Sequence, residues 1–278
     1  MKACRDCGRM WCVLISLAFV AGVVLLLELS WWTPLLVLIG LACPLSALYS
    51  WWVGQQPLVL PDEPAPHTHG MTLDWAAPIY DWYCPKLGLG QAFRQETLRH
   101  AALRPGEAVL EVGCGTGVLS RLAAQTVGSA GYVAGIDPAP RMIALARENA
   151  QRTAIPVEFK LAAIEQLPFP DGRFDVVFAS LMLHHLPPAV KRAGLREVWR
   201  VLKPGGRLVI ADLDRPANRA WWLLFAPLLL MPMLAEQLRG RLPVYLRDAG
   251  FSPVEARGRW LQLLTFWIAM KPREGEDK

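Results

Sequence analysis

The N-terminal part of this 278-residue chain has almost no charge. From Met10 to Pro61, a stretch of 52 residues, the only charged side chain is that of Glu28. The remainder of the chain has an ordinary charge content. Of the 53 charged residues, 48 lie in the last 217 positions and make up about 22% of them, near the roughly 25% typical of soluble domains. This asymmetry excludes a disordered chain, a fibrous repeat and a wholly soluble protein. It predicts a membrane anchor followed by a globular domain.

The chain also lacks a basic run and paired cysteine motifs, and each absence excludes a class of partner or ligand. Although the net charge is +5, the chain has no run of Lys and Arg of the kind that binds a nucleic-acid backbone, so we expect no nucleic-acid partner. A mild excess of cations is instead typical of a surface that faces anionic lipid. The six cysteines are scattered, and Cys4-x-x-Cys7 has no second pair, so we expect neither a disulfide framework nor a metal site.

Two apolar segments fill the uncharged region. Residues 11–29 and 34–53 contain 19 and 20 residues, near the roughly 20 that a helix needs to cross a bilayer, and tryptophans lie at their ends. The first segment exceeds the apolar core of about 7–15 residues found in a secretory signal peptide, and no small-x-small cleavage site follows it. We therefore expect residues 1–54 to form a two-pass membrane hairpin. Since Lys and Arg precede the first span, both termini and the following domain are expected in the cytoplasm.

A globular domain is expected after a proline-rich linker at residues 55–71. From residue 72 to 278, short apolar segments alternate with helical patterns, which indicates an α/β fold with a parallel sheet and helices on both faces. The expected strands are 108–112, 132–136, 157–161, 174–179 and 207–213, the expected helices are 118–127, 141–152 and 188–202, and a closing strand pair is expected at 251–257 and 260–270.

The polar motifs follow the expected strands, at the edge where such sheets bind ligands. The first strand leads into Glu111-Val-Gly-Cys-Gly-Thr-Gly117, whose glycines allow a sharp turn and a close approach to a ligand. Asp137 ends the next strand, about 20 residues further on, where a carboxylate accepts both hydroxyls of a ribose. Together these features indicate an adenosine-containing cofactor. The spacing G-x-G-x-G differs from that of dinucleotide sites, and no Gly-Lys-Ser/Thr is present, which argues against nicotinamide and nucleoside-triphosphate ligands.

A family resemblance rests on motifs that occur in a fixed order. They are VLEVGCGTG at 109–117, Asp137, Leu167-Pro-Phe-Pro170 with Phe174-Asp-Val-Val177, and Arg200-Val-Leu-Lys-Pro-Gly-Gly206. They resemble those of the class I S-adenosylmethionine-dependent methyltransferases, above all the branch with the ubiquinone/menaquinone C-methyltransferases and related lipid methyltransferases. The resemblance implies a Rossmann-like seven-stranded sheet with S-adenosyl-L-methionine as cofactor. It also implies the cofactor-binding residues: Glu111, Gly113, Gly115, Thr116 and Gly117 around the methionine part, Asp137 on the ribose, Ala163 and Ile164 beside the adenine, and Ser180 beneath the cofactor.

Two departures from the family pattern bear on the ligands. Ala163 stands where the family usually has Asp or Asn, so a side-chain contact to the adenine amino group is missing. The signature of the quinone branch is incomplete, because Tyr80-Asp81 lacks the Met-Asn that follows it there and Asp212-Leu-Asp214 replaces Glu-x-Ser. The cofactor assignment is unaffected, while a quinone becomes one acceptor among several.

Methyl transfer is an in-line displacement in which a sulfonium loses its charge, so a dry apolar cleft that aligns the acceptor favours it. The candidate bases are His184 and His185, after the fourth strand, then Asp212 and Tyr80. Capping and packing of the loop is the alternative role of the two histidines. No Asn/Asp-Pro-Pro-Tyr follows the fourth strand, which argues against a nucleobase amino group as acceptor.

The acceptor class depends on an apolar insertion at residues 216–238. Its centre, Ala220–Leu234, has no charge in 15 residues and is flanked by arginines, as an interfacial segment on anionic lipid would be. A buried cover over the acceptor pocket is a compatible alternative. We therefore expect a membrane-anchored methyltransferase of a lipid-soluble acceptor, such as a prenylated quinol or a lipid headgroup. The alternatives are methylation of small hydrophobic thiols or phenols, and a catalytically inactive cofactor-binding membrane module.

Overall fold

The computed structural model describes residues 48–49, 52–53, 58–218, 231–273 and 275. The chain divides into two compact units, Met1–Pro57 and Leu58–Lys278. Nearly all of the hairpin expected from the sequence, and residues 219–230 of the apolar insertion, lie outside the described residues. Within the described ranges, no helix combines the length and the apolar character needed to cross a membrane.

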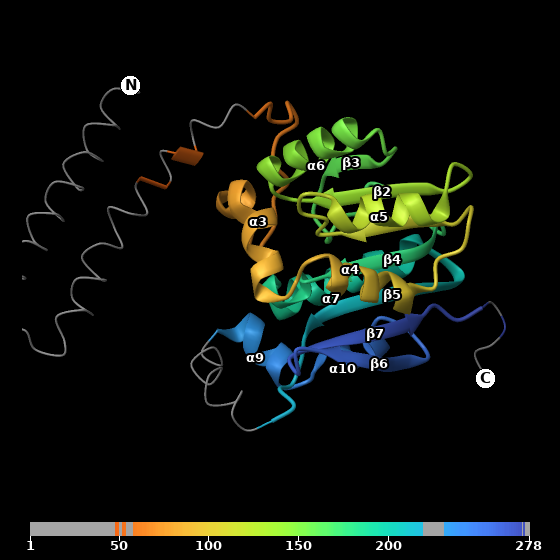
Figure 1. Ribbon diagram of the computed structural model, residues 1–278. Helices are drawn as coiled ribbons and strands as arrows, with labels where there is room; N and C mark the ends of the chain where they lie inside the picture. Colours follow the sequence, from red (N-terminus) through yellow and green to blue (C-terminus); the bar gives the residue numbers. More distant parts are fainter. Residues whose placement is uncertain (1–47, 50–51, 54–57, 219–230, 274, 276–278) are drawn as a thin grey trace, which may run out of the picture. The chain divides into compact units, whose positions relative to one another are not determined.

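The second unit is built around one seven-stranded sheet (Figure 1). Its strands are β1 (Ala108–Val112), β2 (Tyr132–Asp137), β3 (Glu158–Leu161), β4 (Phe174–Ser180), β5 (Leu202–Leu213), β6 (Val254–Trp260) and β7 (Leu264–Met270). They lie in the order β3-β2-β1-β4-β5-β7-β6, and β7 is antiparallel to both of its neighbours while the other pairs are parallel. The prediction of a Rossmann-like seven-stranded sheet is confirmed. The strand order reverses between β1 and β4, which is where open sheets of this kind bind ligands.

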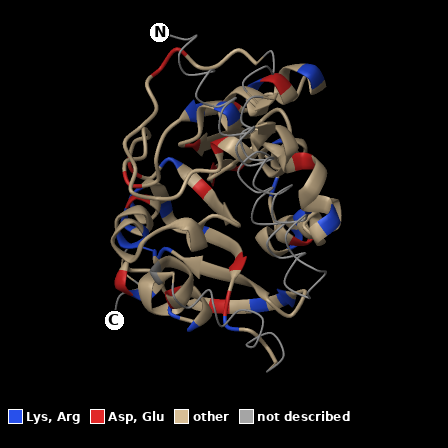
Figure 2. Cartoon of the chain, turned by 90° about the vertical axis from the view of Figure 1, so that its left-hand side faces the viewer, with Lys and Arg blue, Asp and Glu red and all other residues tan. Residues whose placement is uncertain are grey.

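Helices cover both faces of this sheet. Before β3 come η1 (Asp74–Ala76), α3 (Ala77–Tyr83), η2 (Cys84–Leu87), α4 (Gln91–Ala101), α5 (Val118–Val127) and α6 (Pro140–Thr153); after β4 come η3 (Leu183–His185), α7 (Pro188–Val201), α9 (Pro232–Leu238) and α10 (Leu242–Asp248). Helices α4 and α5 share one core with the sheet, and α7 and α10 share another on its opposite face. Along these elements, Lys and Arg residues are interspersed with Asp and Glu residues (Figure 2).

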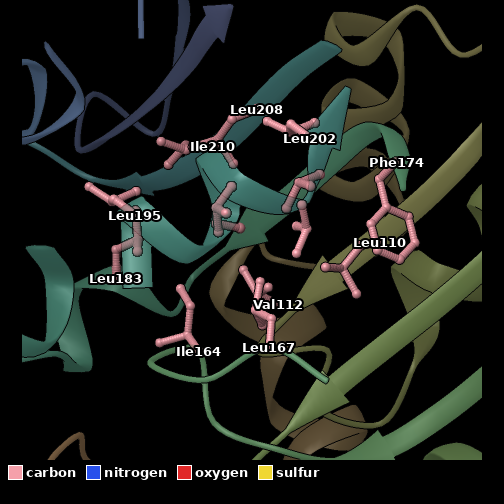
Figure 3. Close-up of a cluster of buried hydrophobic side chains, with 14 of the residues drawn as sticks. Leu110, Val112, Ile164, Leu167, Phe174, Leu183, Leu195, Leu202, Leu208 and Ile210 are labelled. Carbon is pink, nitrogen blue, oxygen red and sulfur yellow. The ribbon is translucent and has the colours of Figure 1, made fainter. Parts of the chain in front are cut away.

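The central strands are buried on both sides, which explains their apolar sequences. In β1 every residue is buried. Leu110 and Val112 belong to the core of α7, where they lie near Ile164 and Leu167 (Figure 3), whereas Val109 belongs to the core of α5. Burial of one such side chain contributes about 1.5–3 kcal/mol. A charged residue in this strand therefore needs a specific role, and Glu111 is that residue.

The strand boundaries differ most from the sequence-based expectation at β5 and in the closing pair. β5 begins at Leu202 rather than 207, because Leu202 pairs with Phe174 before the ladder is interrupted and resumes at Arg207. The closing pair is shifted toward the C-terminus, to 254–260 and 264–270. Phe251, expected in a strand, is instead buried in the core of α7 and α10.

Candidate functional site

The turn from β1 to α5 carries the glycine motif at the carboxyl edge of the sheet. Gly113, Gly115 and Gly117 all have positive φ, at 67°, 54° and 74°. A Cβ at Gly113 would lie 2.7 Å from Cβ of Met182, and one at Gly117 would lie 2.5 Å from Cζ of Phe159. Both the backbone conformation and the lack of space require glycine, so the turn presents bare backbone to the neighbouring cavity.

Asp137, the last residue of β2, lies beside this turn. Its two carboxylate oxygens accept hydrogen bonds from the backbone N–H groups of Gly115, at 3.0 Å, and Ala139, at 2.9 Å. Burial raises the pKa of Asp137 to about 6, although both hydrogen bonds favour the ionised form. Each oxygen keeps lone-pair capacity for another donor, so the carboxylate is fixed in position to accept a diol.

Glu111 lies inside β1 and is only 3% exposed. The hydroxyl of Ser120 on α5 donates to its carboxylate, and burial raises the pKa of Glu111 to about 7. A cavity of about 350 Å³ lies next to this group, and its lining includes Tyr80, Arg94, Glu111, Gly113, Thr116 and Ser180. The structure therefore brings together most of the residues expected around the methionine part of the cofactor, as well as Ser180.

A larger cavity, about 650 Å³ with its mouth included, opens at the same edge of the sheet. Gly113, Gly115 and Asp137 form its cofactor side. Much of its remaining wall is apolar and comes from Leu73, Ile136, Met142, Ile164, Leu181, Met182 and Leu186. The volume lies within the range of about 300–1,000 Å³ that is usual for small-molecule sites.

Residues 68–73 close one side of this cavity, although residues up to 71 were expected to be an extended linker. The backbone N–H of Met71 donates to the carbonyl of His185 at 3.0 Å. The hydroxyl of Thr68 donates to Oε1 of Glu165 at 2.7 Å. Just after this segment, Oδ1 of Asp74 accepts the backbone N–H of Arg141 at the start of α6, at 2.7 Å. These contacts make the segment part of the site.

The loop after β3 supplies the wall expected beside the adenine. Ile164 lines the larger cavity together with Ala162 and Glu165. Ala163 is buried, at 5% exposure, and is not among the lining residues. The side chain at position 163 therefore does not form part of the wall where the cofactor's base is expected.

A carboxylate and two imidazoles form a polar cluster beside the cavity. Nδ1 of His184 lies 2.5 Å from Oδ1 of Asp212, and the backbone N–H groups of Leu183 and Leu213 donate to the same carboxylate at 2.7 Å. Burial by itself would raise the pKa of Asp212, but the adjacent His184 and the N–H of Leu213 more than offset it, so the pKa lies below its usual value. Asp212 is fully buried and positions His184 rather than touching a ligand.

His185 is the histidine that lines the cavity, and its ring centroid lies 4.0 Å from that of His184. Burial and then the proximity of His184 lower the pKa of His185 to about 4, so its imidazole is neutral near pH 7 and can accept a proton. Tyr80 of α3 also lines the cavity. Burial raises the pKa of Tyr80 far above its usual value, which makes it a hydrogen-bond donor rather than a base.

The residues of this edge fit S-adenosyl-L-methionine. The fixed, half-buried carboxylate of Asp137 suits two ribose hydroxyls, and the bare backbone at Gly113 and Gly115 allows a close approach. Residues 109–206 match the family model described as "Methyltransferase domain". A solved SAM-dependent methyltransferase from Aquifex aeolicus has the same fold, with a TM-score of 0.58 and 23% identity over 72% of this chain and 100% of that one. The chain belongs to the class I S-adenosylmethionine-dependent methyltransferases, and S-adenosyl-L-methionine is its cofactor.

Relatives with named activities differ in their acceptors. A 2-phytyl-1,4-naphtoquinone methyltransferase of Synechococcus elongatus is 36% identical over 149 residues, which cover 51% of this chain and 62% of that protein. An arsenite methyltransferase of Halobacterium salinarum is 43% identical over 118 residues, which cover 42% of this chain and 30% of the relative. The match thus spans less than two thirds of either relative, and similarity alone does not give the acceptor.

Several wall residues were missed by sequence reasoning. Thr68 and Met71 fell in the expected linker, where proline content masked their contacts. Met182 was not among the residues expected at the site. Glu165 could have been found, because it stands at a short, fixed distance before the Leu167-Pro-Phe-Pro170 motif.

Proposed function

We propose that this protein is a membrane-associated methyltransferase that methylates a lipid-soluble acceptor, such as a prenylated quinol or a lipid headgroup. The observation that carries this proposal is the composition of the larger cavity. Its cofactor side, at Gly113 and Asp137, continues directly into apolar side chains of Leu73, Leu181 and Leu186. A wall of this kind suits a hydrophobic acceptor that must lie close to the methyl group.

The bound cofactor supplies a methyl group on a positively charged sulfonium. The chain's own residues align the acceptor and exclude water, and a dry cleft favours a reaction in which charge is lost. His185, which is neutral and lines the cavity, accepts a hydrogen bond from a phenolic or hydroquinone hydroxyl and takes its proton only as the methyl group is transferred, because its lowered pKa makes it too weak a base to do so beforehand. Asp212 and His184 hold η3, and therefore His185, in place.

Membrane association is supported by the uncharged N-terminal sequence and by exposed aromatic side chains near the cavity. Trp75 and Trp82 are 60% and 66% exposed, and Leu73 and Tyr80, close to them in sequence, line the cavity. Exposed tryptophans of this kind are typical of a membrane interface. In this proposal residues 1–54 are a two-pass hairpin, and both termini and the catalytic domain lie in the cytoplasm.

Transfer of a tritiated methyl group tests the acceptor class. The full-length chain in detergent micelles would be incubated with labelled S-adenosyl-L-methionine and extracted membrane lipids. Label in the lipid fraction is the expected result, and mass spectrometry of the product would identify the methylated atom. Label only in added small thiols or phenols would refute the lipid acceptor. The absence of label in any acceptor would favour an inactive cofactor-binding module.

A double substitution in the apolar insertion tests the same proposal by an independent route. Trp222→Asp with Phe225→Asp removes two large apolar side chains, each worth about 1.5–3 kcal/mol of burial, so the apparent KM for a long-chain acceptor should rise tenfold or more. A short-chain, water-soluble analogue should be methylated nearly as well as by the parent, and the affinity for S-adenosylhomocysteine should be unchanged. An equal loss with both acceptors would show that the insertion does not bind lipid.

A further inference from the structure

Glu165, in the loop between β3 and β4, has two unequal carboxylate oxygens. Oε1 accepts the hydroxyl of Thr68 at 2.7 Å. Oε2 is buried from solvent, and no donor in the described part of the chain reaches it. Since an unpaired buried acceptor is unfavourable, this oxygen suits a donor that a ligand brings.

The position of Glu165 indicates which part of the ligand it meets. Glu165 lines the larger cavity, as does Ile164 before it in the sequence. It therefore directly follows Ala163 and Ile164, the residues expected beside the adenine. Thr68 lines the same cavity, and its oxygen accepts the backbone N–H of Gly70 at 3.0 Å. The hydroxyl proton of Thr68 is therefore directed at Glu165, which holds the carboxylate in a fixed orientation before any ligand binds.

The adenine ring of the cofactor carries a donor that matches Oε2 of Glu165. The exocyclic amino group of adenine offers two N–H donors, and an ionised carboxylate only accepts. At position 163, where an acidic or amide side chain would serve, this chain has an alanine that is buried outside the cavity wall. We propose that Oε2 of Glu165 accepts a hydrogen bond from the adenine amino group and makes the site selective for adenine. This inference depends on the cofactor assignment and not on the methyl acceptor.

Binding of two cofactor-product analogues tests this assignment without any turnover. S-adenosylhomocysteine carries the amino group, whereas S-inosylhomocysteine carries a carbonyl oxygen at the same place, which would face the carboxylate. Calorimetry on the full-length chain in detergent micelles would give both dissociation constants. The parent should bind S-adenosylhomocysteine at least tenfold more tightly than S-inosylhomocysteine.

Two substitutions at position 165 should change this preference in different ways. Glu165→Ala should weaken S-adenosylhomocysteine about tenfold and leave S-inosylhomocysteine within about twofold, so the two affinities become similar. Glu165→Gln keeps the size of the side chain and adds an amide donor, so S-inosylhomocysteine should bind more tightly than it does to the parent. The unfolding temperature of each ligand-free variant shows whether the fold is intact.

Matched controls separate base recognition from general effects. Glu148→Ala removes the same charge from an exposed site on α6 and should change neither affinity. Asp137→Ala should weaken both analogues alike, because both contain the ribose. The proposal is overturned if the parent shows no preference, or if Glu165→Ala weakens both analogues equally or neither. If the parent binds neither analogue, the cofactor assignment falls as well.

Discussion

Protonation of Asp137 should control cofactor affinity between pH 5 and 8. Burial raises the pKa of this carboxyl to about 6, and ribose hydroxyls donate to its ionised form. Binding therefore lowers that pKa and releases a proton whenever the group is protonated beforehand. If only the ionised form binds, the dissociation constant at pH 5 is larger by a factor of about 10 than at pH 8. We expect this tenfold loss for S-adenosylhomocysteine.

Substitutions at this position separate charge from shape. Asp137→Asn retains one acceptor oxygen but no longer titrates, so its affinity should be weaker at pH 8 and independent of pH. Asp137→Ala removes both hydrogen bonds to the ribose and should weaken binding by about 2–3 kcal/mol, roughly 30- to 150-fold. The substitution also removes the acceptor of the backbone N–H groups of Gly115 and Ala139, which should lower the free energy of unfolding.

Calorimetry in two buffers of different ionisation enthalpy measures both the dissociation constant and the proton release. Glu111, whose pKa burial raises to about 7, is a second group near the cofactor cavities that could produce a pH dependence in this range. Glu111→Gln should therefore retain the tenfold change if Asp137 is its source. A dissociation constant that is equal at pH 5 and pH 8, or an Asp137→Asn variant that still titrates, would refute the ribose assignment.

Three further outcomes follow from buried groups. Because the pKa of Glu111 in the folded chain lies above its ordinary 4.5, the folded state binds the proton more tightly than the unfolded state does. The contribution of Glu111 to the free energy of unfolding therefore falls as pH rises from about 4.5 to 7. Glu111→Gln should remove this loss of up to about 3 kcal/mol, as measured by chemical denaturation. Gly117→Ala places a Cβ against Phe159 at a position of positive φ and should lower the free energy of unfolding by about 2–4 kcal/mol. Gly106→Ala is also at positive φ but faces open space, so it should lower the free energy of unfolding by about 1 kcal/mol. Equal losses of stability would show that the contact with Phe159 is relieved. His185→Gln should lower kcat for a hydroxyl acceptor about a hundredfold and leave the affinity for S-adenosylhomocysteine unchanged, and an unchanged kcat would remove His185 as the base.

The sheet could be predicted because its signals are local. The apolar runs of β1 and β4 and the glycines between β1 and α5 are contiguous in sequence, so pattern and chemistry coincide there. The start of β5 could not be predicted in this way. Lys203-Pro-Gly-Gly206 has the composition of a break, and only the pairing of Leu202 with Phe174 extends the strand beyond it.

The site was predictable to a similar degree. Asp137 and the glycines follow strands directly, so the sequence places them at one edge. Asp212 and His184 were both candidates, but their pairing joins positions 28 residues apart and depends on how η3 packs against β5. The contact of Thr68 with Glu165 joins positions 97 residues apart, and nothing local to either residue indicates it.

The segment before η1, residues 68–73, determines where a shorter fragment of the second unit can begin. Two hydrogen bonds hold this segment, from the hydroxyl of Thr68 to Glu165 and from the N–H of Met71 to the carbonyl of His185, and directly after it Asp74 of η1 accepts the N–H of Arg141 at the start of α6. A fragment that begins at residue 72, where the α/β pattern starts, would lack the hydrogen bonds of Thr68 and Met71 and one wall of the cofactor cavity. A fragment that begins at Leu58 would keep them. The affinity for the cofactor therefore depends on hydrogen bonds made by residues that precede the α/β pattern in the sequence.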